Sequence, residues 1–215
     1  MRLYIVRHGE TDWNVQRRLQ GESDVPLNHE GKVMAVKTGE ALREIPFDLA
    51  VTSPYIRAEE TADLILGDRK LPRLTDPRIR EITWGEWDGK TVEEIKDMGK
   101  KAEFDLFYKA PFQFRGAPGG ETIKQVCARG KNFLEDLEAR PEYAGKTILI
   151  VSHGCTIRGI LNHLYDRPED FWQGMVPPNC AVNILELEQG RIKAWDKDAV
   201  YYDAAMIKDY YHLEE

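Results

Sequence analysis

Apolar runs that end in a histidine and a glycine occur twice along this 215-residue chain. The run Leu3–Val6 leads directly into Arg7-His8-Gly9, and the run Ile148–Val151 leads into Ser152-His153-Gly154. An unbroken apolar run of this length is typical of a strand buried on both faces. The chain therefore builds the same order twice: apolar strand, His-Gly and predicted helix.

The pattern between these runs predicts an alternation of further strands and helices. Strands are predicted at about 47–53, 71–74, 181–187 and 191–195, and helices at about 29–45, 54–66, 91–101, 121–139 and 154–165, with a short helix at 171–172. Ser53 is the expected cap of the second helix, with Pro54 at its first turn. This alternation indicates an α/β three-layer sandwich, in which helices cover both faces of a mainly parallel central sheet. A hairpin around Glu188-Gln189-Gly190 makes one strand antiparallel.

The segment from about 84 to 118 fits this alternation less well. Arg80–Gly89 holds two tryptophans and two glycines and reads as a rigid loop, whereas Phe104–Pro118 is aromatic and irregular. We expect one domain, residues 1–215, with this segment as a flap over a site; the alternative is that its aromatic residues form core under a helix. The tail 198–215 holds four tyrosines and is expected to form a final helix or to lie on the surface.

Composition narrows the class of protein. The chain is 42% hydrophobic and 31% charged, which is typical of a globular protein, and its net charge of -7 argues against broad nucleic-acid binding. No apolar run approaches the roughly 20 residues of a membrane helix, and no secretory signal is recognisable, so the cytoplasm is the expected location. The three cysteines match no metal or redox motif and are expected to be reduced. The late hairpin offers an edge strand to a second subunit, which would make a homodimer.

Four polar side chains are predicted at the carboxyl ends of strands, where open α/β sheets bind ligands: Arg7, His8, Arg57 and His153. Two guanidinium groups and two imidazoles suit a phosphoryl group, because arginine binds two oxygens at once and a neutral imidazole can attack phosphorus. The first amides of the helix after Gly154 are expected to face the phosphate. A leaving alkoxide also needs a proton, and the spacing leaves Glu81 and Glu86 as candidate donors.

Four motifs in order then carry a resemblance that covers nearly the whole chain. Arg7-His8-Gly9-Glu10-Thr11-x-x-Asn14 resembles the signature of the histidine phosphatase superfamily, in its phosphoglycerate mutase-like branch. The second, third and fourth motifs of that family are similar to Ser53-Pro54-x-x-Arg57-Ala58-x-Glu60-Thr61, Arg80-Glu81-Ile82-x-x-Gly85-x-Trp87-x-Gly89 and Val151-Ser152-His153-Gly154.

The resemblance implies a role for each site residue. His8 would be the phosphorylated nucleophile, and Glu81 rather than Glu86 the proton donor. The phosphate pocket would consist of Arg7, Asn14, Arg57, His153 and Gly154. Gln20, with Gly21 beside it, matches a position near the substrate, and neither a metal ion nor another cofactor is implied.

The same resemblance leaves the reaction type to be decided by the segment after the third motif. Mutases of this branch carry a longer, basic, proline-rich insertion there, whereas this segment is short and aromatic, and its Arg115 has no adjacent second arginine. We therefore expect a phosphatase that acts on small phosphorylated metabolites. The alternatives are a cofactor-dependent phosphoglycerate mutase, a dedicated metabolite phosphatase such as α-ribazole phosphatase, and a non-catalytic binder of phosphorylated ligands.

Overall fold

The computed structural model describes residues 1–188 and 191–208. In this part of the chain six strands form one sheet: β1 Arg2–Arg7, β2 Leu49–Thr52, β3 Arg73–Thr75, β4 Thr147–Ser152, β5 Val182–Glu188 and β6 Arg191–Ala199. The α-helices are α1 Asp12–Val15, α2 His29–Ala41, α3 Ile56–Leu66, α4 Val92–Asp97, α5 Lys101–Lys109, α6 Ile123–Glu138 and α7 Gly154–Leu161. No helix in the described residues is both long and apolar enough to span a membrane.

The sheet has the strand order β3-β2-β4-β1-β5-β6. β1 pairs in parallel with β4, and β2 pairs in parallel with both β4 and β3. β5 runs antiparallel to β1 and to β6, so it alone among the described strands points the other way. This arrangement confirms the expected α/β sandwich with a mainly parallel sheet, one antiparallel strand and a late hairpin.

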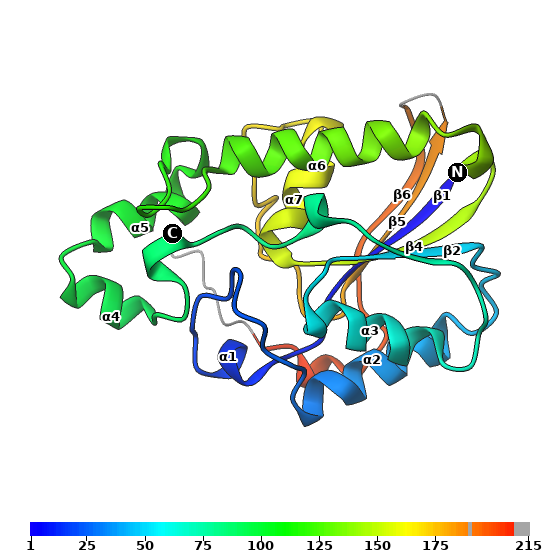
Figure 1. Ribbon diagram of the computed structural model, residues 1–215, viewed down its shortest axis with the longest axis horizontal. Coiled ribbons are helices and arrows are strands. Elements are labelled where there is room, and N and C mark those ends of the chain that lie inside the picture. The colour runs from blue at the N-terminus through cyan, green and yellow to red at the C-terminus, as the bar shows by residue number, and fades with distance from the viewer. Residues whose placement is uncertain (189–190, 209–215) are drawn as a thin grey trace.

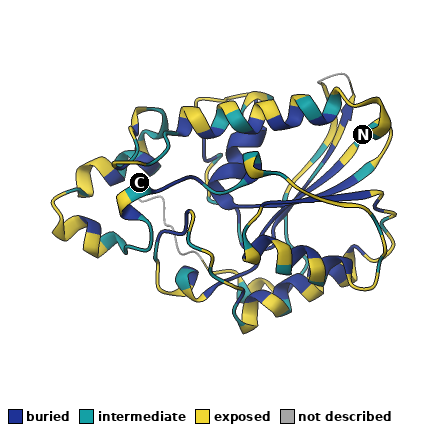
Figure 2. Cartoon of the chain, in the orientation of Figure 1, coloured by how far each residue is buried: buried dark blue, intermediate teal, exposed yellow. Residues whose placement is uncertain are grey.

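Helices cover both faces of the sheet (Figure 1), and alternate residues of β1 belong to different buried clusters. Leu3 and Ile5 belong to a buried cluster with side chains of α6 and α7, whereas Tyr4 and Val6 belong to a cluster with side chains of α3. Since successive side chains of a strand point to opposite faces, four apolar residues in a row supply both clusters. Figure 2 shows this as central strands that are buried along their length.

The segment 84–118 differs from the expectation. Where one helix over 91–101 and an irregular stretch after it were expected, the chain forms α4 and α5, separated by a turn in which Gly99 has a φ of 73°. Phe104 and Phe107 face inward from α5 into a cluster that also contains Trp84 and Trp87. The aromatic residues are thus core under and between short helices, and the signal for α5 was their spacing at i and i+3.

Several element ends also differ. α3 begins at Ile56 with Tyr55 as its N-cap, so Ser53 is not the cap that the sequence predicts. α7 ends at Leu161, and residues 171–172 lie in turns rather than in a helix. The turn residues Gln189-Gly190 and the tail residues 209–215, about which the sequence also made predictions, lie outside the described residues.

Candidate active site

The ends of β1 and β4 bring two histidines together. Arg7 pairs with Ser152 in the parallel register, so His8 and His153 leave the sheet side by side at the same edge. Their ring centroids lie 5.1 Å apart, and both side chains are buried. The repeated strand-His-Gly pattern therefore places two imidazoles next to each other.

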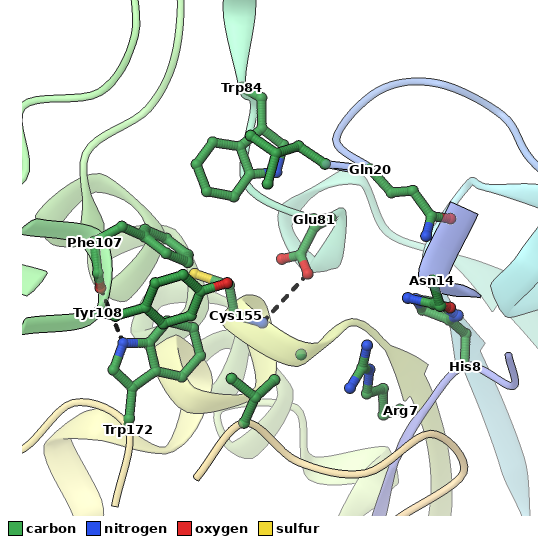
Figure 3. A pocket seen from close by; sticks show the side chains of 13 residues that line it. Arg7, His8, Asn14, Gln20, Glu81, Trp84, Phe107, Tyr108, Cys155 and Trp172 are labelled. Carbon is green, nitrogen blue, oxygen red and sulfur yellow. Dashed lines mark hydrogen bonds between the residues drawn. The ribbon is translucent and has the colours of Figure 1, made fainter. Parts of the chain in front are cut away.

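A pocket opens beside this edge (Figure 3). Its empty space, including the open mouth, is about 460 Å³. Six predicted site residues line it: Arg7, His8, Asn14, Gln20, Glu81 and Gly154. The other three, Gly21, Arg57 and His153, are buried and are not part of the pocket lining.

His8 is held as a neutral imidazole. Its Nδ1 lies 2.7 Å from the carbonyl oxygen of Gly9, which can only accept, so Nδ1 carries the proton and Nε2 does not. Burial lowers the pKa of His8 well below its usual value, and the charges of Arg57 and Arg7 lower it further. A neutral imidazole with a lone pair on Nε2 is what a nucleophilic attack requires.

His153 is also neutral in this structure. Its Nδ1 accepts a hydrogen bond from Nε of Arg57 at 3.3 Å, and its Nε2 lies 2.7 Å from Oγ of Ser53. Burial lowers the pKa of His153, and the charge of Arg57 lowers it further. Ser53, expected to cap a helix, contacts this imidazole, and α3 begins three residues after it.

Arg57 is fully buried, and its guanidinium is occupied by protein groups on three sides. Nη1 donates to the carbonyl of Ser23 at 2.8 Å and Nη2 to that of Gly21 at 2.9 Å, in addition to the bond from Nε to His153. The charged carbon also lies 4.7 Å from the centre of the Tyr55 ring. Arg57 therefore binds the loop 21–23 and orients His153.

The polar residues on the pocket wall come mainly from the loop after β1. Asn14 is fixed by a capping box, in which its Oδ1 accepts from the amide of Thr11 at 3.0 Å. Gln20 accepts at Oε1 from the hydroxyl of Thr11 at 2.8 Å, which directs its amide nitrogen into the pocket (Figure 3). Arg7 packs directly against Gly154, where an added Cβ would lie 3.4 Å from Nε of the arginine.

Glu81 lies opposite His8, and its carboxylate meets the N-terminus of α7. Its Oε2 accepts from the amide of Cys155 at 3.2 Å, and its Oε1 accepts from the amide of Thr156 at 3.1 Å. The sequence predicted that the first amides of this helix would face a phosphate. The amides of Cys155 and Thr156 bind Glu81 instead. Glu86 is exposed and does not line the pocket, so the geometry separates the two candidate acids.

The other side of the pocket is apolar, and most of it was missed by sequence reasoning. Its residues are Leu19, Trp84, Phe107, Tyr108, Cys155, Trp172 and Val176. The rings of Phe107 and Trp84 lie 4.6 Å apart, and Tyr108 stacks on Trp172 at 5.6 Å. Burial raises the pKa of the Cys155 thiol well above its usual value, which agrees with a packing role. The helical spacing of Phe107 and Tyr108 after Phe104 was the signal that could have placed them on one helix.

No group of three or more histidine, cysteine or acidic side chains within 1–188 and 191–208 is arranged to hold a metal ion. The chemistry available in the pocket comes from the imidazole, guanidinium, amide and carboxyl groups described above.

Comparison with known proteins agrees with this geometry. The sequence model of the histidine phosphatase superfamily (branch 1) matches residues 3–197. The uncharacterized phosphatase PhoE of Bacillus subtilis is 32% identical, over 89% of this chain and 92% of its own length. The probable phosphoglycerate mutase GpmB of an Enterobacter species is 28% identical, over 88% of this chain and 86% of its own length.

Solved structures have the same fold. YhfR of Bacillus stearothermophilus has a TM-score of 0.84 and 36% identity, covering 96% of this chain and 99% of that one. A mycobacterial glucosyl-3-phosphoglycerate phosphatase in complex with VO3 has a TM-score of 0.79 and 28% identity, covering 94% and 99%. The order of the four motifs, the paired histidines and these similarities lead to one conclusion: the chain belongs to the histidine phosphatase superfamily.

Proposed function

We propose that the protein is a phosphatase that hydrolyses small phosphomonoesters through a phosphohistidine at His8. The observation that carries the proposal is the state of His8: Nδ1 is bound to the Gly9 carbonyl, and the neutral ring lines the pocket. The relatives named above include phosphatases, which supports a hydrolase.

The reaction has two displacements. In the first, Glu81 takes part as the carboxylic acid: Nε2 of His8 attacks phosphorus, the bond from phosphorus to the ester oxygen breaks, and Glu81 gives its proton to the leaving alkoxide. In the second, Glu81 takes a proton from water, the resulting hydroxide attacks the phosphohistidine, and inorganic phosphate leaves with His8 restored. The position of Glu81 across the pocket from His8 supports this division of roles (Figure 3).

The phosphate group would be held by the polar side of the pocket. Arg7 supplies a permanent positive charge, and Asn14 and Gln20 supply amide groups. We propose that His153 and Arg57 act from behind His8, where they stabilise the charge that develops on the phosphoryl oxygens. An arriving phosphate dianion would favour protonation of His153, in opposition to the neighbouring guanidinium groups.

The apolar side of the pocket favours hydrolysis over phosphoglycerate mutation. A phosphoglycerate carries a carboxylate besides its phosphate, and Arg7 is the one cationic side chain among the described residues that line the pocket. With Glu81 also present, a second anionic group would lie against rings and a carboxyl group without a partner. The similarity to GpmB keeps mutase activity as the second candidate.

A labelling experiment tests the proposal. Brief reaction with a phosphomonoester labelled in its phosphate should leave an acid-labile, alkali-stable label on His8, and His8→Ala should abolish both the label and turnover. Normal turnover by His8→Ala would contradict the mechanism. A parallel assay with 3-phosphoglycerate, which reports released phosphate and 2-phosphoglycerate separately, decides between hydrolysis and mutation.

The remaining expectations from the sequence stay predictions. We propose a single domain in which the segment 84–118 covers the pocket. Location in the cytoplasm, the absence of nucleic-acid and membrane partners and the formation of a homodimer await measurement.

A further inference from the structure

A largely buried ion pair lies next to the backbone that carries the proton donor of the proposed mechanism. Arg129 of α6 and Glu121 meet with two parallel contacts, from Nε to Oε1 at 2.9 Å and from Nη2 to Oε2 at 3.1 Å. The exposed fractions of the two side chains are only 11% and 13%. A paired, two-bond geometry of this kind fixes the direction of both groups as well as their distance.

The same two side chains bind the backbone on either side of Glu81. Nη1 of Arg129 donates to the carbonyl of Arg78 at 2.6 Å and to that of Arg80 at 2.8 Å. Oε2 of Glu121 accepts from the amide of Thr83 at 3.0 Å. The backbone is thus held just before and just after Glu81 by this ion pair, and Nη2 of Arg80 also lies 3.1 Å from Oε1 of Glu121.

The pair also reaches the carboxyl group of Glu81 through one hydroxyl. Nη2 of Arg129 lies 3.3 Å from Oγ of Thr156, and that hydroxyl lies 2.6 Å from the Arg80 carbonyl and 3.1 Å from Oε1 of Glu81. The guanidinium of Arg129 therefore contacts the backbone beside Glu81 directly, and it reaches the Glu81 carboxyl group through the hydroxyl of Thr156.

The opposite charges of Arg129 and Glu121 make the pair sensitive to the loss of either residue. Burial raises the pKa of Glu121, but hydrogen bonds from Arg129 and Thr83 and the charge of Arg80 outweigh it, so the net shift is downward. Without Arg129, the Glu121 carboxylate would keep the Thr83 amide and Arg80 but lose its two-bond partner, and the Arg78 carbonyl would lose the hydrogen bond that Arg129 donates.

We propose that Arg129, together with Glu121, is a positioning residue that places Glu81 for proton transfer to the leaving group. The inference rests on the proposed function, in which Glu81 is the donor. His8 follows directly after β1, and its Nδ1 is bound to the Gly9 carbonyl rather than to this pair, so loss of the pair should impair proton donation more than nucleophilic attack.

The dependence of rate on the leaving group tests this. An alkyl phosphate needs protonation of its alkoxide, whereas 2,4-dinitrophenyl phosphate releases a phenolate that needs no proton. Glu81→Gln should lower kcat/KM for the alkyl phosphate by about 10²–10⁴-fold and leave the dinitrophenyl ester nearly unchanged. Arg129→Lys keeps the positive charge but loses the two-bond guanidinium geometry. It should lower kcat/KM for the alkyl phosphate by about 10²-fold and leave kcat/KM for the dinitrophenyl ester nearly unchanged.

Two further variants complete the design. Arg129→Lys added to Glu81→Gln should cause no further loss on the alkyl phosphate, because the donor on which it acts is already absent. Arg69→Lys is the matched control, since Arg69 also donates to backbone carbonyls but at the far end of α3. If Arg129→Lys does not fold, Glu121→Gln takes its place.

The outcomes separate the two claims. Equal loss on both substrates in Arg129→Lys, or further loss in the double variant, overturns the positioning role and leaves the proposed function standing. If Glu81→Gln itself shows no dependence on the leaving group, the donor assignment of the proposed function fails.

Discussion

The two sides of the pocket are held by different kinds of interaction. On the polar side of the pocket, which we call the phosphate side, hydrogen bonds fix the orientation of the side chains. His8 is bound to the Gly9 carbonyl, and Arg57 is bound to two carbonyls and to His153. On the apolar side, aromatic rings pack on one another, and Nε1 of Trp172 donates a hydrogen bond to the carbonyl of Phe107 at 2.9 Å.

This difference determines which amino-acid substitutions each side of the pocket tolerates. Hydrogen bonds to backbone groups require one side chain in one place, so the phosphate side tolerates little substitution. Apolar packing depends mainly on volume, so the aromatic side can be exchanged for other apolar residues at modest cost. The same phosphoryl chemistry can therefore be combined with different leaving groups, and three predictions examine this division.

The largest effect is expected from His153→Gln. Because His153 lies against His8 and is shared by all substrates, kcat/KM should fall by about 10²–10³-fold for small and bulky phosphomonoesters alike. Steady-state kinetics with both substrates measure it, with the exposed His29→Gln on α2 as control. A loss confined to one substrate would contradict the division between the two sides.

An intermediate effect is expected from pH, through stability rather than activity. The pKa of His8 and that of His153 are both lowered in the folded protein, so below about pH 6.5 the unfolded chain binds more protons than the folded one. The free energy of unfolding is therefore highest above that pH. As the pH falls below it, each histidine lowers the free energy of unfolding by up to about 1.4 kcal/mol per pH unit.

Urea denaturation between pH 7 and pH 5 measures this dependence. His8→Asn and His153→Asn should each flatten it, and the double variant should flatten it most. An unchanged slope in the double variant would mean that the two histidines are not held neutral.

The smallest effect is expected from Tyr108→Ala on the aromatic side. Loss of its stacking on Trp172 should raise KM for a bulky aryl phosphate by about tenfold and leave a small alkyl phosphate unaffected. Tyr143→Ala, which removes a tyrosine outside the pocket, is the control. An equal rise for both substrates would show that Tyr108 supports the phosphate side as well.

The phosphate side was the more predictable of the two. Apolar runs before His8 and His153 indicated two central strands, and parallel pairing then required the histidines to be neighbours. What the motifs did not indicate was the direction of Arg57, whose guanidinium faces the loop 21–23 and His153. That direction depends on carbonyls distant in sequence, which no local pattern encodes.

The aromatic side was predicted less well. The segment 84–118 has few strands or long helices to reveal a period, and its two short helices derive their stability from the shared cluster around Phe104 and Phe107. A short helix of this kind is stable because neighbouring elements bury it, so its own sequence predicts it only weakly.

The amino-acid sequence by itself determined the order of the four motifs along the chain, the family and a set of candidate site residues, because strand burial and strand ends follow from local apolar runs. Only the tertiary structure decided which groups meet: Ser53 with His153, Glu81 with the start of α7, and the aromatic wall with the pocket. The physical reason is that hydrogen bonds and ring contacts between distant segments depend on how whole elements pack, which local periodicity does not specify.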